Sequence, residues 1–395
     1  MVQHIWIRLM RRPLEAIAVL LFTAVIALVL CGLHMGNEEA RKQYEEIYTT
    51  IAVRCTVTNL AGDQSDKLPL SVATLGLFTG TYEHGSSDLM PYVEDVQTKG
   101  SEKIFRNGME YTLTAITSME IAPALWPENG CVIFWEDGYD ARVFGSEELV
   151  CLIPEALAKN LEEQGESVDT LPLFLKAELP QFQTDYEGEL KIVGTYSSDD
   201  DTTIYFPWRS YVGIKRSCNG YENVQAIRAT IRDNRTLEEF RAVASAYFVE
   251  PNPNYAGRVE VDGFYQALDI NDYQLKQADL TLRNSMRVNE LVTLLVFVAS
   301  ALAGFFVGFL VIRSRKREIT LMRTLGCSNG RIYEEFAIEQ LLCILGGVLL
   351  GGSYTLWQPI WKLAVFAVVN FVGLSTALLV FLNSNLLATI KEDES

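Results

Sequence analysis

The sequence has little histidine and no P-loop motif for binding ATP. Its 395 residues include three histidines, at positions 4, 34 and 84, which are too scattered to form a metal cluster or a Ser-His-Asp order. No GxxxxGK[ST] sequence occurs, so the loop that surrounds the phosphates of ATP is missing, and no CxxC pair is present. These absences argue against a metalloenzyme, a serine hydrolase and a P-loop ATPase.

Basic residues are scarce in the middle of the chain. Residues 34–287 hold 41 Asp and Glu against 22 Lys and Arg, whereas the rest of the chain holds 9 acids and 11 bases. Phosphate binding needs concentrated Lys and Arg, so an acidic middle segment makes nucleic acid an unsuitable partner.

Four apolar runs are long enough to cross a lipid bilayer. They cover residues 14–33, 291–312, 338–357 and 363–382, and only Glu15 interrupts the first, near the end where its carboxylate can snorkel. The first run could also be a signal peptide, but we favour an uncleaved helix because no cleavage site is convincing. The Arg-rich flanks predict cytoplasmic termini, a cell-membrane location and an extracytoplasmic middle segment.

The middle segment shows mixed α/β patterning. Polar helical stretches at 37–47 and 272–287 would prolong the neighbouring spans as stalks. Between them, short strands are expected at 51–58, 112–116, 131–135, 191–196 and 225–232, with helices at 153–161 and 236–248. Thr236 and Glu239 have capping-box spacing at the start of the second helix. The fold class is therefore an α-helical membrane protein with four transmembrane helices and a mixed α/β domain inserted between helices 1 and 2.

Four cysteines lie in this middle segment, at Cys55, Cys131, Cys151 and Cys218. In an extracytoplasmic domain they allow three pairings, and the sequence leaves disulfides and buried thiols equally open.

A short basic segment, residues 313–330, separates the second and third apolar runs. It holds five bases and one acid, Glu318, and the positive-inside rule keeps it in the cytoplasm. Ile319, Met322 and Leu325 recur at i, i+3 and i+6, which predicts a short helix with one apolar face that could press on another protein. Gly326 is placed to end that helix, and Ser328 to cap the next.

This segment resembles the cytoplasmic loop of the FtsX-like and MacB-type ABC transporter permeases. The matching residues are Arg315, Lys316, Arg317, Glu318, Ile319, Leu321, Met322, Arg323, Leu325, Gly326, Phe336, Glu339 and the glycines from Gly346 to Gly352. Two shorter stretches, 149–158 and 191–207, are similar to the MacB ectodomain. On the charges alone, the basic residues could equally serve only to orient the spans.

The resemblance implies a non-catalytic permease subunit in which the loop is a coupling helix that contacts an ABC ATPase. The expected contacts are Arg315, Lys316, Arg317, Glu318, Ile319, Met322, Arg323, Leu325 and Gly326. ATP and Mg²⁺ would be bound by the ATPase chain, so no cofactor is expected here. A second permease chain, identical or different, would complete the complex. The implied domains are residues 1–36, the ectodomain 37–287 and the permease domain 288–395.

Other residues of the spans are expected to pack helices. Gly304 and Gly308 form a GxxxG motif, and Gly347 and Gly351 are spaced in the same way. Glu339 lies just inside the membrane, where it either pairs with an Arg of the basic segment or snorkels.

The substrate is left open by the sequence. The resemblance implies efflux of, or resistance to, peptides or antimicrobial compounds, with lipoprotein release or control of a cell-wall hydrolase as alternatives. A motor-free membrane receptor or scaffold is a further possibility, and an extracytoplasmic enzyme is another. The run from Asp199 to Asp201 lacks the glycine and distal Glu of a calcium loop and is read as a solvated hairpin tip.

Overall fold

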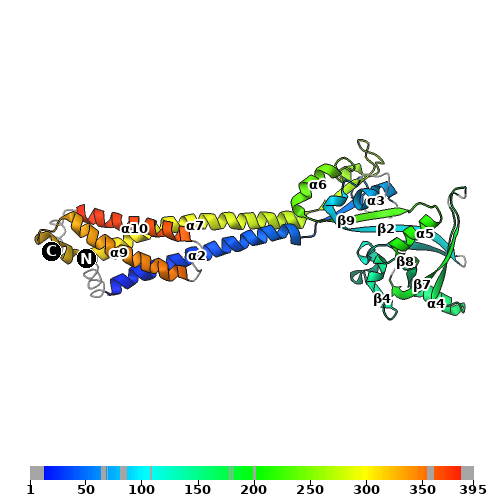
Figure 1. The fold of residues 1–395 in the computed structure, drawn as a ribbon, viewed down its shortest axis with the longest axis horizontal. Helices are drawn as coiled ribbons and strands as arrows, with labels where there is room; N and C mark the ends of the chain where they lie inside the picture. Colours follow the sequence, from blue (N-terminus) through cyan, green and yellow to red (C-terminus); the bar gives the residue numbers. More distant parts are fainter. Residues whose placement is uncertain are drawn as a thin grey trace. The chain divides into compact units, whose positions relative to one another are not determined.

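The computed structural model of the chain describes residues 13–63, 68, 70–80, 87–106, 109–177, 179, 181–198, 202–353 and 360–383. It divides into two compact units (Figure 1). The helical unit comprises Met1–Ile47 and Gln277–Ser395, and the sheet unit is Tyr48–Lys276. The predicted stalk at 37–47 and most of the predicted stalk at 272–287 therefore belong to the helical unit, and both are continuous with the neighbouring apolar helices as expected.

Long apolar helices make up the helical unit. The helices are α2 (Pro13–Thr50), α7 (Tyr273–Ser314), α8 (Lys316–Thr324), α9 (Asn329–Gly352) and α10 (Ile360–Asn383). Within the described residues, α2, α7, α9 and α10 are long and apolar enough to cross a membrane, as expected. Helices α2 and α7 have 38 and 42 residues, about twice the length that a bilayer requires. Their polar parts meet where Arg283 donates a 2.9 Å hydrogen bond to the Tyr44 hydroxyl.

The sheet unit is a ten-stranded mixed sheet with helices packed on it. Neighbouring strands follow the order β10 (Ala267–Asn271), β1 (Arg54–Thr58), β9 (Val224–Ile231), β2 (Val93–Arg106), β3 (Met109–Ile116), β8 (Thr203–Pro207), β5 (Val150–Pro154), β7 (Tyr186–Ser197) and β4 (Val132–Trp135), while β6 (Thr170–Leu175) pairs with β7. The pairs β3–β8 and β5–β7 are parallel. The helices are α3 (Val72–Thr79), α4 (Glu155–Glu163), α5 (Trp208–Ser217) and α6 (Leu237–Ala244). The mixed α/β class was expected, but the strand order was not.

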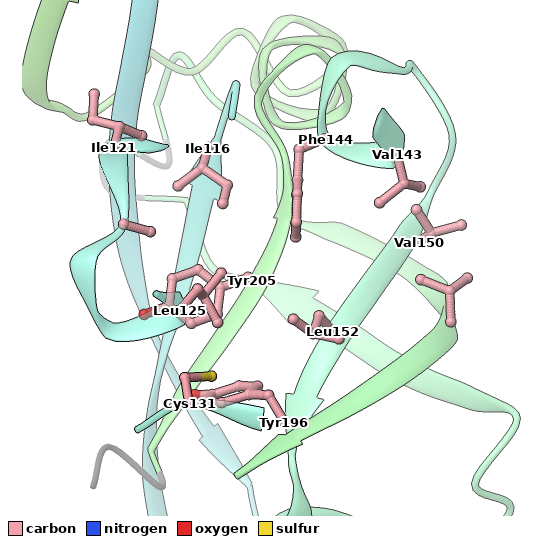
Figure 2. Close-up of a cluster of buried hydrophobic side chains, with 12 residues drawn as sticks. Ile116, Ile121, Leu125, Cys131, Val143, Phe144, Val150, Leu152, Tyr196 and Tyr205 are labelled. Carbon is pink, nitrogen blue, oxygen red and sulfur yellow. The ribbon is translucent and has the colours of Figure 1, made fainter. Parts of the chain in front are cut away.

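A buried cluster fills the half of the sheet unit around β5, β7 and β8 (Figure 2). Leu152 of β5 and Phe144 are at most 1% exposed. The rings of Tyr196 and Tyr205 meet edge to face at 5.5 Å, and the Tyr196 hydroxyl donates a 2.6 Å bond to the Thr203 carbonyl. A tyrosine can be a core residue when its buried hydroxyl keeps a hydrogen-bond partner.

One corner of the sheet unit holds the end of α2 and the start of α7. Asn234 donates a 2.7 Å hydrogen bond to the Ile51 carbonyl, just past the end of α2. Arg241 of α6 donates a 2.6 Å bond to Asp272, which precedes α7 and also pairs with Lys276 at 2.9 Å. The chain segments that lead into and out of the sheet unit are therefore hydrogen-bonded within that unit.

The predicted capping box at α6 is wrong. The Thr236 side chain caps no N–H of the helix, and its hydroxyl donates to the Asp233 carbonyl at 2.8 Å. A short 3₁₀ turn, Asn234–Thr236, precedes α6 and is capped by the Asp233 carboxylate, so the capping function moves three residues upstream.

All seven cysteines are described, and none is in a disulfide. Burial raises the pKa of Cys55 to about 12 and also raises the pKa of Cys151. Both buried side chains therefore stay thiols near neutral pH, and the thiolate is the reactive form. We expect a maleimide at pH 7–9 to modify the half-exposed Cys218 in the folded chain and to spare Cys55 and Cys151 until urea is added. Mass spectrometry of the labelled peptides measures this, and rapid labelling of Cys151 in the native protein would contradict it.

Candidate docking site at the α7–α9 loop

The short helix α8 follows α7 with almost no gap. Arg315 alone separates Ser314, the last residue of α7, from Lys316, the first of α8. Gly326 has φ +84°, a left-handed conformation that glycine adopts without strain, and it ends the α8 segment. Ser328 then accepts a hydrogen bond from the Arg331 N–H and caps α9. These start and stop residues act as the sequence predicts.

Arg315 is buried in an ion-pair network and is not on the surface. It is 2% exposed, and its Nη1 and Nη2 atoms donate to the two carboxylate oxygens of Glu339 at 2.7 and 2.6 Å. Its Nε donates to Glu15 at 2.9 Å, and its guanidinium lies 5.4 Å from the centre of the Phe336 ring. Burial alone would lower the pKa of Arg315, but the two carboxylates raise it above its ordinary value, so the group stays charged.

This network corrects two expectations from the sequence. Arg315 cannot be an exposed contact for a partner, because its donors are taken up by acids of the same chain. Glu15 does not simply snorkel, since it accepts hydrogen bonds from Arg315 and Ser314. The sequence left two alternatives for Glu339, an ion pair with an Arg or snorkelling, and the structure shows the ion pair with Arg315. Arg315, the partner of Glu15, lies 300 residues away in the sequence. The sequence alone gives no signal for a pairing between such distant residues.

The inner face of α8 packs on the helices. Ile319 is fully buried, and Met322 packs on the cluster that contains it. Arg323 donates a 2.6 Å hydrogen bond to the Leu382 carbonyl near the end of α10. The buried members of this cluster are Ile312, Ile319, Ile332, Phe336, Ala377, Leu378 and Leu382. Ile319 is thus wrongly predicted as a partner contact, because the apolar spacing that suggested an external interface is used for internal packing.

The opposite face of α8 is exposed and carries both charge and apolar surface. Leu321 is 63% exposed and Leu325 is 82% exposed, and Arg317 lies one turn before Leu321. Gly326 follows on the same exposed edge, while Lys316 and Glu318 are half-buried at its side. We call Arg317, Leu321 and Leu325 the outer face of α8. Leu321 matches the family pattern in the sequence, but it was not among the expected contacts.

The glycines of the spans lie at two close helix contacts. A Cβ on Gly308 of α7 would come within 2.6 Å of Leu374, and one on Gly304 within 3.1 Å of the Asn370 carbonyl, both on α10. On α9, a Cβ on Gly347 would come within 1.8 Å of the Thr23 hydroxyl, and one on Gly351 within 2.5 Å of the Ala24 carbonyl, both on α2. These four positions allow the backbones of paired helices to approach.

The other candidate sites receive no support. Residues 199–201 and His84 lie outside the described residues. In the part of the chain that the structure describes, no group of three or more His, Cys, Asp or Glu side chains could hold a metal ion.

Comparison with known proteins gives a similarity to solved structures alone. No family model and no curated protein matches the chain. Among solved structures, it is similar to the periplasmic region of MacB from Actinobacillus actinomycetemcomitans, at 14% identity over 59% of this chain and 94% of that one, with a TM-score of 0.30. At this identity and TM-score the match assigns no family, and function must be inferred from the chain's own residues.

Proposed function

We propose that this chain is the membrane-embedded, non-catalytic subunit of an ABC-type transporter of the MacB/FtsX kind, driven by an ATPase on a separate chain. The observation that carries the proposal is the outer face of α8. Two exposed leucines beside Arg317 sit on a short helix between two helices that can cross a membrane. A central apolar contact with a charged rim is how stable protein interfaces are built.

The contacts of α8 suit a part that transmits force. Three contacts hold α8 to the neighbouring helices: the Arg315–Glu339 ion pair, the buried Ile319 side chain and the Arg323–Leu382 hydrogen bond. A displacement of α8 by a partner would therefore move α7, α9 and α10 with it. Helix α7 continues unbroken from Ser314 to Tyr273.

The remaining parts of the proposal follow from this role. ATP and Mg²⁺ bind to the ATPase chain and not to this one. The chain lies in the cell membrane with its termini in the cytoplasm and the sheet unit outside. One coupling helix per chain requires a second permease chain for two ATPases. Efflux of peptides or antimicrobial compounds is the proposed activity of the complex.

Replacement of Leu321 or Leu325 by Asp should remove the ATPase. Each change puts a carboxylate into the centre of the proposed contact, and loss of one buried leucine costs about 1.5–3 kcal/mol, so the affinity should fall about tenfold or more. Affinity capture of the tagged chain from mild detergent, with mass spectrometry and an ATPase assay of the eluate, measures the loss.

The matched control is Leu280→Asp on the polar part of α7, where the leucine is 55% exposed and distant from α8 in the sequence. This variant should retain the ATPase. If the unchanged chain is recovered alone and without ATP turnover in several detergents and lipids, the proposal is wrong and a motor-free receptor becomes the better reading.

A further inference from the structure

A groove in the sheet unit lies between the ends of strands β2 and β3 and strand β6. Its volume is about 470 Å³, within the range of about 300–1,000 Å³ that is usual for small-molecule sites. The lining residues come from β2, β3, β8 and the segment from Glu166 through β6. None of them belongs to the helical unit or to the α8 site.

The groove has apolar walls and a buried apolar floor. Phe105 of β2 is 76% exposed and Phe174 of β6 is 53% exposed, and both residues line the groove. Leu171 and Ile204, at most 1% exposed, also line it. Exposed aromatic rings beside a concave surface are costly in water, and an apolar ligand that covered them would remove that cost.

Arg106 lines the groove, and one of its donor atoms lacks an acceptor. The Arg106 side chain is 17% exposed, and its Nη2 atom pairs with Glu166. Its Nη1 atom is buried, and no hydrogen-bond acceptor among the described residues reaches it. A buried N–H without a partner carries the full cost of desolvation, and a ligand oxygen would remove that cost.

The surrounding charges favour an uncharged ligand. The positive charge of Arg106 is already compensated by Glu166, and Lys103 is likewise paired with Glu110. Residues 34–287 as a whole carry 19 more acids than bases, so a ligand anion would be repelled. A carbonyl oxygen can accept the Arg106 hydrogen bond without adding charge.

A peptide strand is a poor occupant. Strand β6 pairs only with β7 among the described strands, so its other edge is unpaired. That strand contains Pro172, which has no N–H and interrupts the row of donors that an added strand would need.

We propose that this groove binds a small, uncharged, largely apolar molecule that places a carbonyl oxygen against Arg106, between the rings of Phe105 and Phe174. This site does not depend on the ATPase and would exist whether or not the chain is driven by one.

Benzophenone is a suitable probe, because it has two aromatic rings, one carbonyl oxygen and no charge, and it forms covalent adducts under ultraviolet light. The full chain in lipid nanodiscs is irradiated with increasing probe, and the labelled peptides are identified by mass spectrometry. We expect saturable labelling at residues 104–106 and 170–174. Labelling of the helical unit, which reports partition into lipid, should instead rise without saturation.

The matched change is Arg106→Met, which keeps an unbranched side chain of similar length and removes the donors. It should raise the half-saturating concentration at the groove about tenfold, whereas Arg142→Met, at an exposed arginine paired with Asp140, should leave it unchanged. On the unchanged protein, fluorenone, which retains the carbonyl, should compete with benzophenone for labelling of the groove. Diphenylmethane, which lacks the carbonyl, should compete about tenfold less well. The anion 4-benzoylbenzoate should label the groove more weakly than benzophenone.

If Arg106→Met does not fold, two other experiments still test the proposal. Phe174→Ala, at an exposed ring, should reduce groove labelling in a folded chain, and the competition experiment needs no variant. Absence of saturable labelling at the groove would overturn the proposal, as would equal competition by diphenylmethane and fluorenone.

Discussion

Replacement of Arg315 by alanine is expected to destabilise the helical unit by about 3–5 kcal/mol, the cost of leaving a buried charge unpaired. The Glu339 side chain is 3% exposed, and Arg315 donates one hydrogen bond to each of its carboxylate oxygens. Without Arg315, the Glu339 carboxylate would lose both of these hydrogen bonds inside the helix cluster. Equilibrium unfolding of the full chain in mixed detergent and SDS micelles measures the change.

The reverse change, Glu339→Ala, should cost less than Arg315→Ala. Arg315 would still be paired with Glu15, at 2.9 Å, whose side chain is 24% exposed and therefore partly in contact with solvent. As a control, Arg142→Ala breaks an ion pair whose arginine is 92% exposed, and it should have no measurable effect on unfolding. Equal losses for Arg315→Ala and Arg142→Ala would show that the buried network does not stabilise the fold.

Replacement of Gly347 by alanine is expected to separate α9 from α2 and to destabilise the helical unit by about 3 kcal/mol, the upper part of the range for overpacked sites. The added Cβ would lie 1.8 Å from the Thr23 hydroxyl and 2.6 Å from the Leu20 carbonyl. The carbonyl belongs to the helix backbone and cannot rotate away, so the two helices must move apart. The same unfolding experiment measures the loss.

The neighbouring glycine provides the matched control. A Cβ on Gly346 would meet only Leu20 Cδ1, at 3.5 Å, which is an ordinary contact. Gly346→Ala should therefore be neutral or slightly stabilising, because alanine favours the helix by up to about 1 kcal/mol relative to glycine. A Gly346→Ala variant as unstable as Gly347→Ala would contradict the proposed contact between α2 and α9.

Local sequence rules predicted those features that depend on neighbouring residues. The long apolar helices, the stop at Gly326 and the cap at Ser328 all follow from residues within a few positions of each other. The capping box at Thr236 failed although its spacing was right, because the Asp233 carboxylate started a 3₁₀ turn first. The Asp233 cap and the Thr236 capping box were both possible helix starts, and the residue spacing alone could not show which of them would form.

The sequence alone determined four apolar runs long enough to cross a bilayer, an acidic α/β segment between the first two and a short basic amphipathic helix after the second. Only the tertiary structure decided which face of that helix is free. Ile319 and Leu321 are both apolar, yet one is fully buried and the other is 63% exposed. Likewise Arg315 and Arg317 are both basic, but only Arg315 meets Glu339 and Glu15. The reason is that hydropathy and charge are properties of a residue, whereas burial and pairing depend on partners brought close by the fold from distant positions in the chain.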